Sequence, residues 1–183
     1  RGRPPPPRPP RAGPPGGGGG GRRPRAPPPP GGGPRRRGPP PWTAADFAEG
    51  CTGCAACVEA CPEGVLKLGA GRLVELDLSS AGCTLCGECA SRCEAGLFDG
   101  ARPAFPWIAT IGEACLALAG IHCRSCQDAC EPAAIRFRPA PGGVALAELD
   151  SQRCNGCGAC LAPCPSQAIQ LRALSTEESP RHA

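Results

Sequence analysis

Sixteen cysteines in four groups of four are the feature that most constrains how this chain of 183 residues can fold. In three groups the cysteines are separated by two, two and three residues, and in the remaining group seven residues separate the first two. The groups are Cys51, Cys54, Cys57 and Cys61; Cys83, Cys86, Cys89 and Cys93; Cys115, Cys123, Cys126 and Cys130; and Cys154, Cys157, Cys160 and Cys164. No cysteine is left over, so their chemistry has to use sets of four.

The regular spacing is typical of the [4Fe-4S] clusters of bacterial-type ferredoxins. Iron in a sulfide-bridged cube prefers soft thiolate ligands, and one cysteine completes the coordination of each iron. Small residues inside the loops let the backbone wrap around the cluster and point N–H groups at its negative charge. These small residues are Gly53, Ala55, Gly87, Gly156 and Gly158. The sequence therefore predicts four [4Fe-4S] clusters.

The ligand sets are predicted to cross between motifs, because the fourth cysteine of a motif ligates the other cluster in two-cluster ferredoxins. The set around the stretched motif is the least regular, and its longer loop exposes the cluster differently. The predicted sets are Cys51, Cys54 and Cys57 with Cys93; Cys83, Cys86 and Cys89 with Cys61; Cys115, Cys123 and Cys126 with Cys164; and Cys154, Cys157 and Cys160 with Cys130.

Other ligand chemistries fit the pattern less well. Structural zinc favours two separated Cys-x-x-Cys pairs, which leaves the regular triplets with the wrong number of ligands per loop. Disulfides require an oxidising compartment. His122 stands beside Cys123, but four cysteines already complete each site, so we interpret it as a surface residue or a hydrogen-bond partner of a ligand.

Residues 1–41 differ sharply from the rest in composition. They contain ten arginines, runs of proline and glycine, and neither an acidic residue nor a cysteine. Subtracting their charge of +10 from the net +4 leaves −6 for residues 42–183. Such a segment is predicted to be a disordered, solvated tail, with weak nucleic-acid or partner binding through arginine as the alternative. No feature indicates specific nucleic-acid recognition.

The cysteine motifs alternate with short apolar stretches. The chain has only six aromatic residues, so its hydrophobic core is expected to be small and to need bound metal for stability. Alternation of apolar and polar residues predicts hairpins and extended segments. The expected elements are a short helix from Thr43 to Gly50, a hairpin of 65–68 with 73–78, an extended segment 105–111, a short helix Glu113–Ala119, a hairpin of 135–138 with 144–149, and a closing strand 168–171.

These elements predict an α+β fold of two tandem bacterial-type two-cluster ferredoxin-like units, residues 42–100 and 101–175, with a C-terminal tail at 176–183. No apolar stretch follows Arg22 and Arg23 as an export signal requires, and no apolar run reaches transmembrane length. We expect a cytoplasmic protein. No phosphate loop, nucleotide-binding glycine pattern or acid/base constellation indicates a substrate pocket, so we expect no enzymatic activity.

Several stretches resemble the NapF-type ferredoxin family. They are IGEACLA at 111–117, CRSCQDACEPAAIRFRP at 123–139, SQRCNGCGACLAPCPSQAI at 151–169, PPW at 40–42 and CTGCAAC at 51–57. The likeness covers about residues 40–172. The stretched third motif is what this family shows, whereas the long proline-rich N-terminal segment departs from the family's short basic one.

The resemblance implies a cytoplasmic protein with four [4Fe-4S] clusters that contacts the unexported catalytic subunit of the periplasmic nitrate reductase. That subunit is a molybdenum and iron-sulfur enzyme, and the implied role is to assist its maturation by cluster assembly or electron supply. Two alternatives stay open: an electron-transfer subunit of a multisubunit oxidoreductase, and a partner-binding scaffold in which the clusters only staple the fold.

Overall fold

The computed structural model describes residues 37–141 and 145–174. These residues fall within one compact unit. The predictions for residues 1–36, for residue 144 at the start of a predicted strand and for the C-terminal tail at 176–183 lie outside the described residues.

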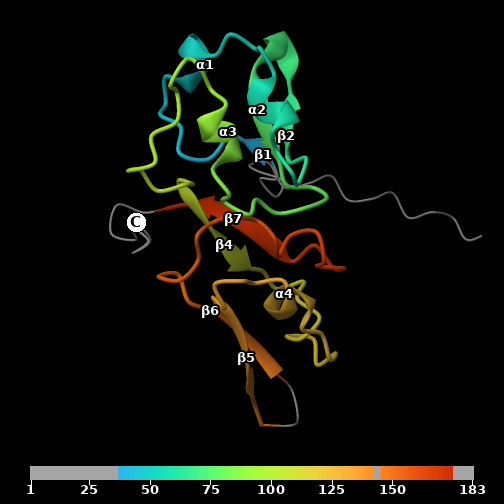
Figure 1. The fold of residues 1–183 in the computed structure, drawn as a ribbon. Coiled ribbons are helices and arrows are strands. Elements are labelled where there is room, and N and C mark those ends of the chain that lie inside the picture. The colour runs from blue at the N-terminus through green and yellow to red at the C-terminus, as the bar shows by residue number, and fades with distance from the viewer. Residues whose placement is uncertain (1–36, 142–144, 175–183) are drawn as a thin grey trace, which may run out of the picture. The chain divides into compact units, whose positions relative to one another are not determined.

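The described chain is built of one-turn helices and short antiparallel strands, as expected for the predicted α+β class (Figure 1). Its elements in chain order are β1 (Arg37–Gly38), α1 (Phe47–Gly50), α2 (Ala56–Glu59), β2 (Leu66–Leu68), a 3-10 turn (Ala70–Arg72), β3 (Val74–Asp77), α3 (Glu88–Ser91), β4 (Trp107–Ile111), α4 (Ser125–Asp128), β5 (Ile135–Pro139), β6 (Ala145–Leu149) and β7 (Ile169–Ala173).

In the first half, β2 and β3 form the predicted hairpin, with Leu66 opposite Leu76. Alternate residues of β3 point inward, so Val74 and Leu76 are buried in the core. The short helix α1 ends at Gly50, as the sequence predicts, but it begins at Phe47 and not at Thr43. The alternation of apolar and polar residues therefore predicted the hairpin, and Gly50 predicted the end of the helix.

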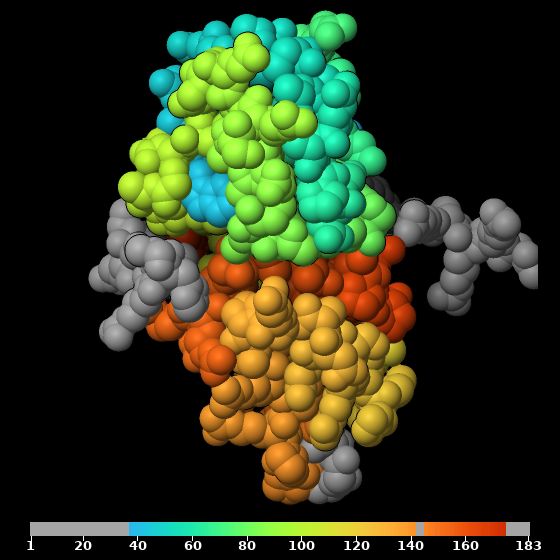
Figure 2. Space-filling model, viewed as in Figure 1, coloured from blue at the N-terminus to red at the C-terminus, as the bar shows by residue number. Residues whose placement is uncertain are grey.

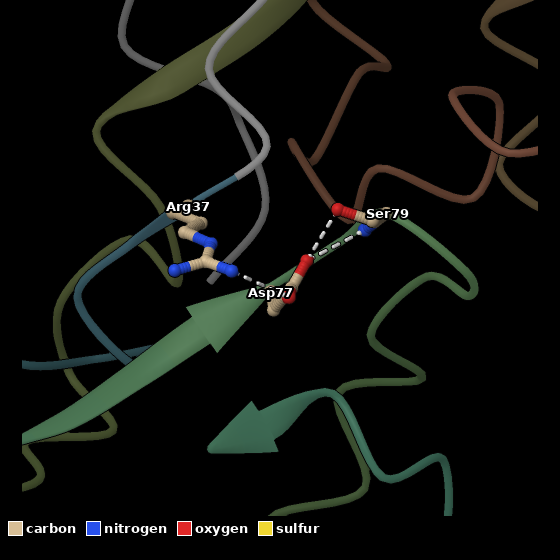
Figure 3. Close-up of polar contacts among 3 residues, drawn as sticks. All are labelled: Arg37, Asp77 and Ser79. Atoms are coloured by element: carbon tan, nitrogen blue, oxygen red, sulfur yellow. Dashed lines mark hydrogen bonds and ion pairs between the residues drawn. The ribbon is translucent and has the colours of Figure 1, made fainter. Parts of the chain in front are cut away.

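The strand β1 pairs with the free edge of β3, which gives the order β1-β3-β2. Figure 3 shows Arg37 reaching Asp77, with an N–O distance of 3.5 Å, and Asp77 accepting hydrogen bonds from the N–H and hydroxyl of Ser79. The bond from the Ser79 hydroxyl, helped by its N–H and by Arg37, lowers the pKa of the Asp77 carboxyl.

Residues 37–41 therefore belong to the fold, whereas the sequence placed them in the tail. Pro40 and Pro41 are fully buried, and the hydroxyl of Thr43 donates to the Pro40 carbonyl at 2.8 Å. The composition did not indicate this, because proline and arginine are typical of solvated tails. A short edge strand can nevertheless have such a composition, since it needs only a neighbouring strand whose edge is unpaired.

The second half contains two strand pairs. The predicted hairpin forms between β5 and β6, and β4 pairs along its whole length with β7. The first half repeats this plan with its β2–β3 hairpin, and its outer pair is reduced to one bridge between Thr43 and Phe98. The predicted segments at 105–111 and 168–171 are thus strands of one sheet, a pairing that their local pattern did not reveal.

The predicted helix at Glu113–Ala119 is wrong, because this segment consists of turns. Ala119 donates to Cys115, but Gly120 then adopts a φ of 79° and Ile121 donates to Leu116. A single helical turn without further propagation is too short to be stable alone. Conversely, α2, α3 and α4 form inside the cysteine motifs, where the sequence analysis assigned no helix.

The turn after each motif is repeated four times. The residue three positions after the last cysteine donates its N–H to the carbonyl of that cysteine. It also has a positive φ each time, namely Gly64 (60°), Gly96 (65°), Ala133 (51°) and Gln167 (52°). The first half has glycine at this position, and glycine adopts a positive φ without strain. The second half has Ala133 and Gln167, for which the same backbone conformation is unfavourable.

Substitution of Gly64 by alanine tests the importance of this turn. A methyl group would meet no atom within 4 Å, so the expected cost of about 1 kcal/mol in the free energy of unfolding comes from the left-handed backbone alone. For a domain of this size the melting temperature should fall by about 3 °C. Gly100→Ala is the control, because Gly100 also has open space but no positive φ. An equal melting temperature for both variants would contradict this account.

Candidate metal centres

The first cysteine cage consists of Cys51, Cys54 and Cys57 from the first motif and Cys93 from the second. Their side chains line a cavity of about 300 Å³ together with apolar residues that include Phe47, Val74 and Phe98. Burial raises the pKa of the Cys57 thiol, and repulsion from the other three sulfurs of the cage raises it further. Four thiols from two motifs thus share one apolar space.

The second cage is the reciprocal one, made of Cys83, Cys86 and Cys89 with Cys61. Its cavity of about 20 Å³ is also lined by Trp42, Leu66 and Leu76. Burial raises the pKa of Cys83 to about 11 and that of Cys89 to about 12, and repulsion from neighbouring thiolates contributes to both. Cys61 of the first motif therefore belongs to the cage of the second motif, and Cys93 of the second motif belongs to the cage of the first.

The fourth cage repeats the arrangement in the second half with Cys154, Cys157, Cys160 and Cys130. These cysteines line a cavity of about 10 Å³ beside strand residues that include Ala109 and Ile135. The N–H of Ala109 donates to the Cys154 sulfur at 3.4 Å. Burial, with repulsion from Cys157 first among the neighbouring thiolates, raises the pKa of the Cys160 thiol.

The third cage gathers the stretched motif and the last cysteine of the chain, Cys164. Burial, with repulsion from Cys164, Cys115 and Cys123, raises the pKa of Cys126 to about 11. Cys115 and Cys164 also pack into one small apolar cluster with Ala168. The seven-residue interval is therefore compatible with a set of four, because most of the added residues, among them Leu118 and Ile121, are exposed at the surface.

The three regular motifs share a backbone form that suits a negatively charged group. In each, the residue two positions after the first cysteine and the residue directly after the second have a positive φ; these are Gly53 and Ala55, Leu85 and Gly87, and Gly156 and Gly158. Such alternation turns successive N–H groups toward one concave side, a nest for anions. The loop wrapping predicted from small residues is confirmed, although Leu85 adopts the same conformation.

Backbone N–H groups donate directly to several cysteine sulfurs. The donors are Leu85 to Cys83 (3.4 Å), Ala109 to Cys154 (3.4 Å), Ala134 to Cys130 (3.2 Å) and Ala168 to Cys164 (3.3 Å). The identities of the residues do not reveal these groups, because the donors are backbone atoms. Two of them have a sequence signal, since Ala134 and Ala168 each follow the last cysteine of a motif by four residues.

The cages fit iron-sulfur cubes better than single metal ions or disulfides. All sixteen cysteines lie among the described residues, and all are free. Within that part of the chain, no three histidine, cysteine or acidic side chains are placed to hold one ion. A zinc ion holds four sulfurs at about 2.3 Å from one centre, whereas a cube spreads its four thiolate ligands over four irons. Four thiols that gather from two motifs without converging on one point match the second case.

The remaining candidates have structural roles or are exposed. Trp107 packs in the core, where it stacks on Phe105 with ring centroids 5.0 Å apart and donates its indole N–H to the Gly156 carbonyl at 3.0 Å. His122 is exposed beside Cys123.

Comparison with a known domain family supports the same chemistry. Residues 50–97 and 121–168 each match the 4Fe-4S dicluster domain, so two copies of a two-cluster domain occur in this chain. The predictions of four [4Fe-4S] clusters and of two tandem ferredoxin-like units are confirmed. Across residues 37–141 and 145–174, no helix has the length and apolar character needed to cross a bilayer.

Individual relatives extend the likeness beyond the cysteines. The ferredoxin-type protein NapF of Escherichia coli K12 is 44% identical over 130 residues, which are 70% of this chain and 79% of the relative. The protein of that name from Haemophilus influenzae is 42% identical over 72% of this chain and 76% of its own length. A component of an ion-translocating oxidoreductase complex from Methanosarcina acetivorans is 44% identical over only 52 residues, 28% of this chain and 18% of that protein.

Iron and acid-labile sulfide analysis of anaerobically purified protein tests the cage assignment. Four clusters with four irons each predict sixteen of both atoms per chain. Zinc without sulfide would contradict the assignment. About twelve irons per chain would show that one cage does not hold a cluster. The third cage, which is the irregular one, is then the first to examine.

Cluster formation in the iron-free chain should become more complete as the pH rises from about 7 to about 9, because ligand thiols must lose protons to bind iron. Burial raises the pKa of Cys83 to about 11 and that of Cys89 to about 12. Below these values the proton competes with iron, so acid opposes assembly and alkali favours it. The visible absorbance after reconstitution at fixed iron and sulfide measures the yield, and a yield that falls over this range would contradict the expectation.

Proposed function

The chain belongs to the NapF-type ferredoxin family, and we propose that it is an accessory protein for the catalytic subunit of a periplasmic nitrate reductase. It would act before that subunit is exported, by supplying electrons or by helping to assemble its iron-sulfur cluster. The observation that carries the proposal is the likeness to NapF proteins over more than two thirds of both chains.

We further propose that the four cages are the ligand sets of the four clusters. A bound [4Fe-4S] cluster accepts and releases single electrons at a potential set by its surroundings. The chain supplies those surroundings through sixteen thiolates, the backbone N–H groups that donate to sulfurs, and the apolar residues that line the first, second and fourth cages. In this assignment residues 42–100 and 101–175 are the two two-cluster units.

This role requires no catalytic residue in the chain itself. Electron transfer needs clusters close to one another and to a docking face, so we propose a non-enzymatic carrier. Residues 42–183 carry a charge of −6, which favours approach to a basic surface on the partner and predicts weaker association at high salt. Sixteen free thiols suit a reducing compartment, which supports the cytoplasm as the place of action.

A second function has some support from the comparisons. The match to a component of an ion-translocating oxidoreductase complex favours an electron-transfer subunit held permanently in a larger assembly. The match covers only 52 residues, and a pair of cysteine motifs alone is enough to produce it. We therefore prefer the accessory role.

The state of the captured partner distinguishes these functions. Affinity purification of the intact chain from cells that make a periplasmic nitrate reductase should recover the catalytic subunit with its export signal still attached. A stable stoichiometric complex that contains only the mature enzyme, or a membrane oxidoreductase, would contradict the accessory role and favour permanent membership of a larger assembly.

Replacement of Cys157 by serine tests whether the clusters take part. This variant should lose one cluster, so that about twelve irons remain, and should still bind the catalytic subunit while activating it less. His122→Asn is the matched control, because His122 is an exposed neighbour of a cage cysteine and should keep sixteen irons and full activation. Full activation by Cys157→Ser, with one cluster demonstrably lost, would contradict a redox role for that cage.

A further inference from the structure

Two cages from different halves of the chain meet through their ligand loops. The backbone N–H of Cys83, in the second cage, donates to the carbonyl of Cys157, in the fourth cage, at 2.9 Å. Figure 2 shows the green residues of the first half and the orange and red residues of the second in continuous contact. A direct hydrogen bond between two ligand residues leaves no side chain between the loops at this point.

Two glycines make this contact possible. A methyl group on Gly82 would lie 2.5 Å from the Ala159 Cα and 2.6 Å from its backbone nitrogen. A methyl group on Gly158 would lie 2.5 Å from the Leu78 side chain. Real Cβ atoms do not approach other atoms this closely, because the repulsion is too steep. Each loop therefore lacks a side chain where it presses on the other half.

Within each half, the two cages are joined by a short helix. Helix α2 carries Cys57 of the first cage and leads into Cys61 of the second, and it packs against α3, which carries Cys89. In the second half, α4 carries Cys126 of the third cage and leads into Cys130 of the fourth. The order in space is therefore first, second, fourth, third, which differs from the order in the sequence.

We infer that Gly82, Cys83, Cys157 and Gly158 form a junction that joins the four cages into one linear electron path with the first and third cages at its ends. The inference rests on the proposed ligand sets and deepens the proposed function. Across the junction one electron passes between the cages of Cys83 and Cys157, so that the half that loses it is oxidised and the half that gains it is reduced. No bond is made or broken and no proton is needed.

Two pairs of alanine variants separate the junction from general effects of substitution. Gly82→Ala is matched by Gly100→Ala, since neither glycine has a positive φ and only Gly82 has a close neighbour. Gly158→Ala is matched by Gly71→Ala. Both glycines have a positive φ, of 74° and 66°, and a methyl group would meet Leu78 at the first and no atom within 4 Å at the second. Gly71 lies in the 3-10 turn between β2 and β3, away from the cysteine loops.

The measurements are made on the complete iron-loaded protein and need no nitrate reductase. Dithionite, a one-electron donor, reduces the clusters, and EPR spectroscopy records the broadening that magnetic interaction between neighbouring reduced clusters produces. Both junction variants should lose the part of this broadening that arises between the halves, while both controls keep it. Hydrogen exchange at the Cys83 amide should become roughly two- to tenfold faster in Gly82→Ala, as expected for the loss of one hydrogen bond.

The result that overturns the inference is wild-type broadening in junction variants that keep sixteen irons, or an equal loss in the controls. If Gly82→Ala loses iron, Gly158→Ala decides, because its methyl group would press on the buried side chain of Leu78 and not on the backbone of the other half. Activation of the catalytic subunit is then measured separately. Lost coupling with full activation would count against the junction as a path, and intact coupling without any activation would count against the proposed function alone.

Discussion

The crossing of the fourth cysteine from each motif to the neighbouring cage is the constraint on which the rest of the structure depends. Cys61 and Cys93 change places in the first half, and Cys130 and Cys164 do so in the second. Neither motif of a pair can complete a set of four alone, so each half has to fold as a unit. The one-turn helix that carries the third cysteine in three motifs supplies the change of direction.

The cages also replace much of an ordinary hydrophobic core. The third cysteine of every motif, Cys57, Cys89, Cys126 and Cys160, is only 7% exposed and belongs to the main buried cluster. Few aromatic residues are available to fill the interior, so buried sulfur takes their place. Burial raises the pKa of these thiols, and iron is the partner that allows them to be both buried and ionised. Stability and cofactor binding are therefore two aspects of one arrangement.

The halves repeat one plan but differ in how they close it. In the second half β4 and β7 pair over five residues each, while in the first half one bridge and the edge-to-face packing of Phe47 on Phe98 replace that sheet. The strand β1 then covers the exposed edge of β3. This asymmetry leaves the loops of Cys83 and Cys157 facing each other, and there the absence of side chains at Gly82 and Gly158 matters most.

The sequence by itself determined the cysteine sets, the two hairpins and the helix before Cys51, because these depend on spacing and on local alternation of apolar residues. It misjudged residues 37–41 and the turns at 113–119, where a partner strand and a left-handed glycine override local composition. Only the tertiary structure decided that β4 pairs with β7, and that Cys83 meets Cys157. Contacts between residues so far apart in the chain leave no periodic pattern, since they depend on how completed halves pack.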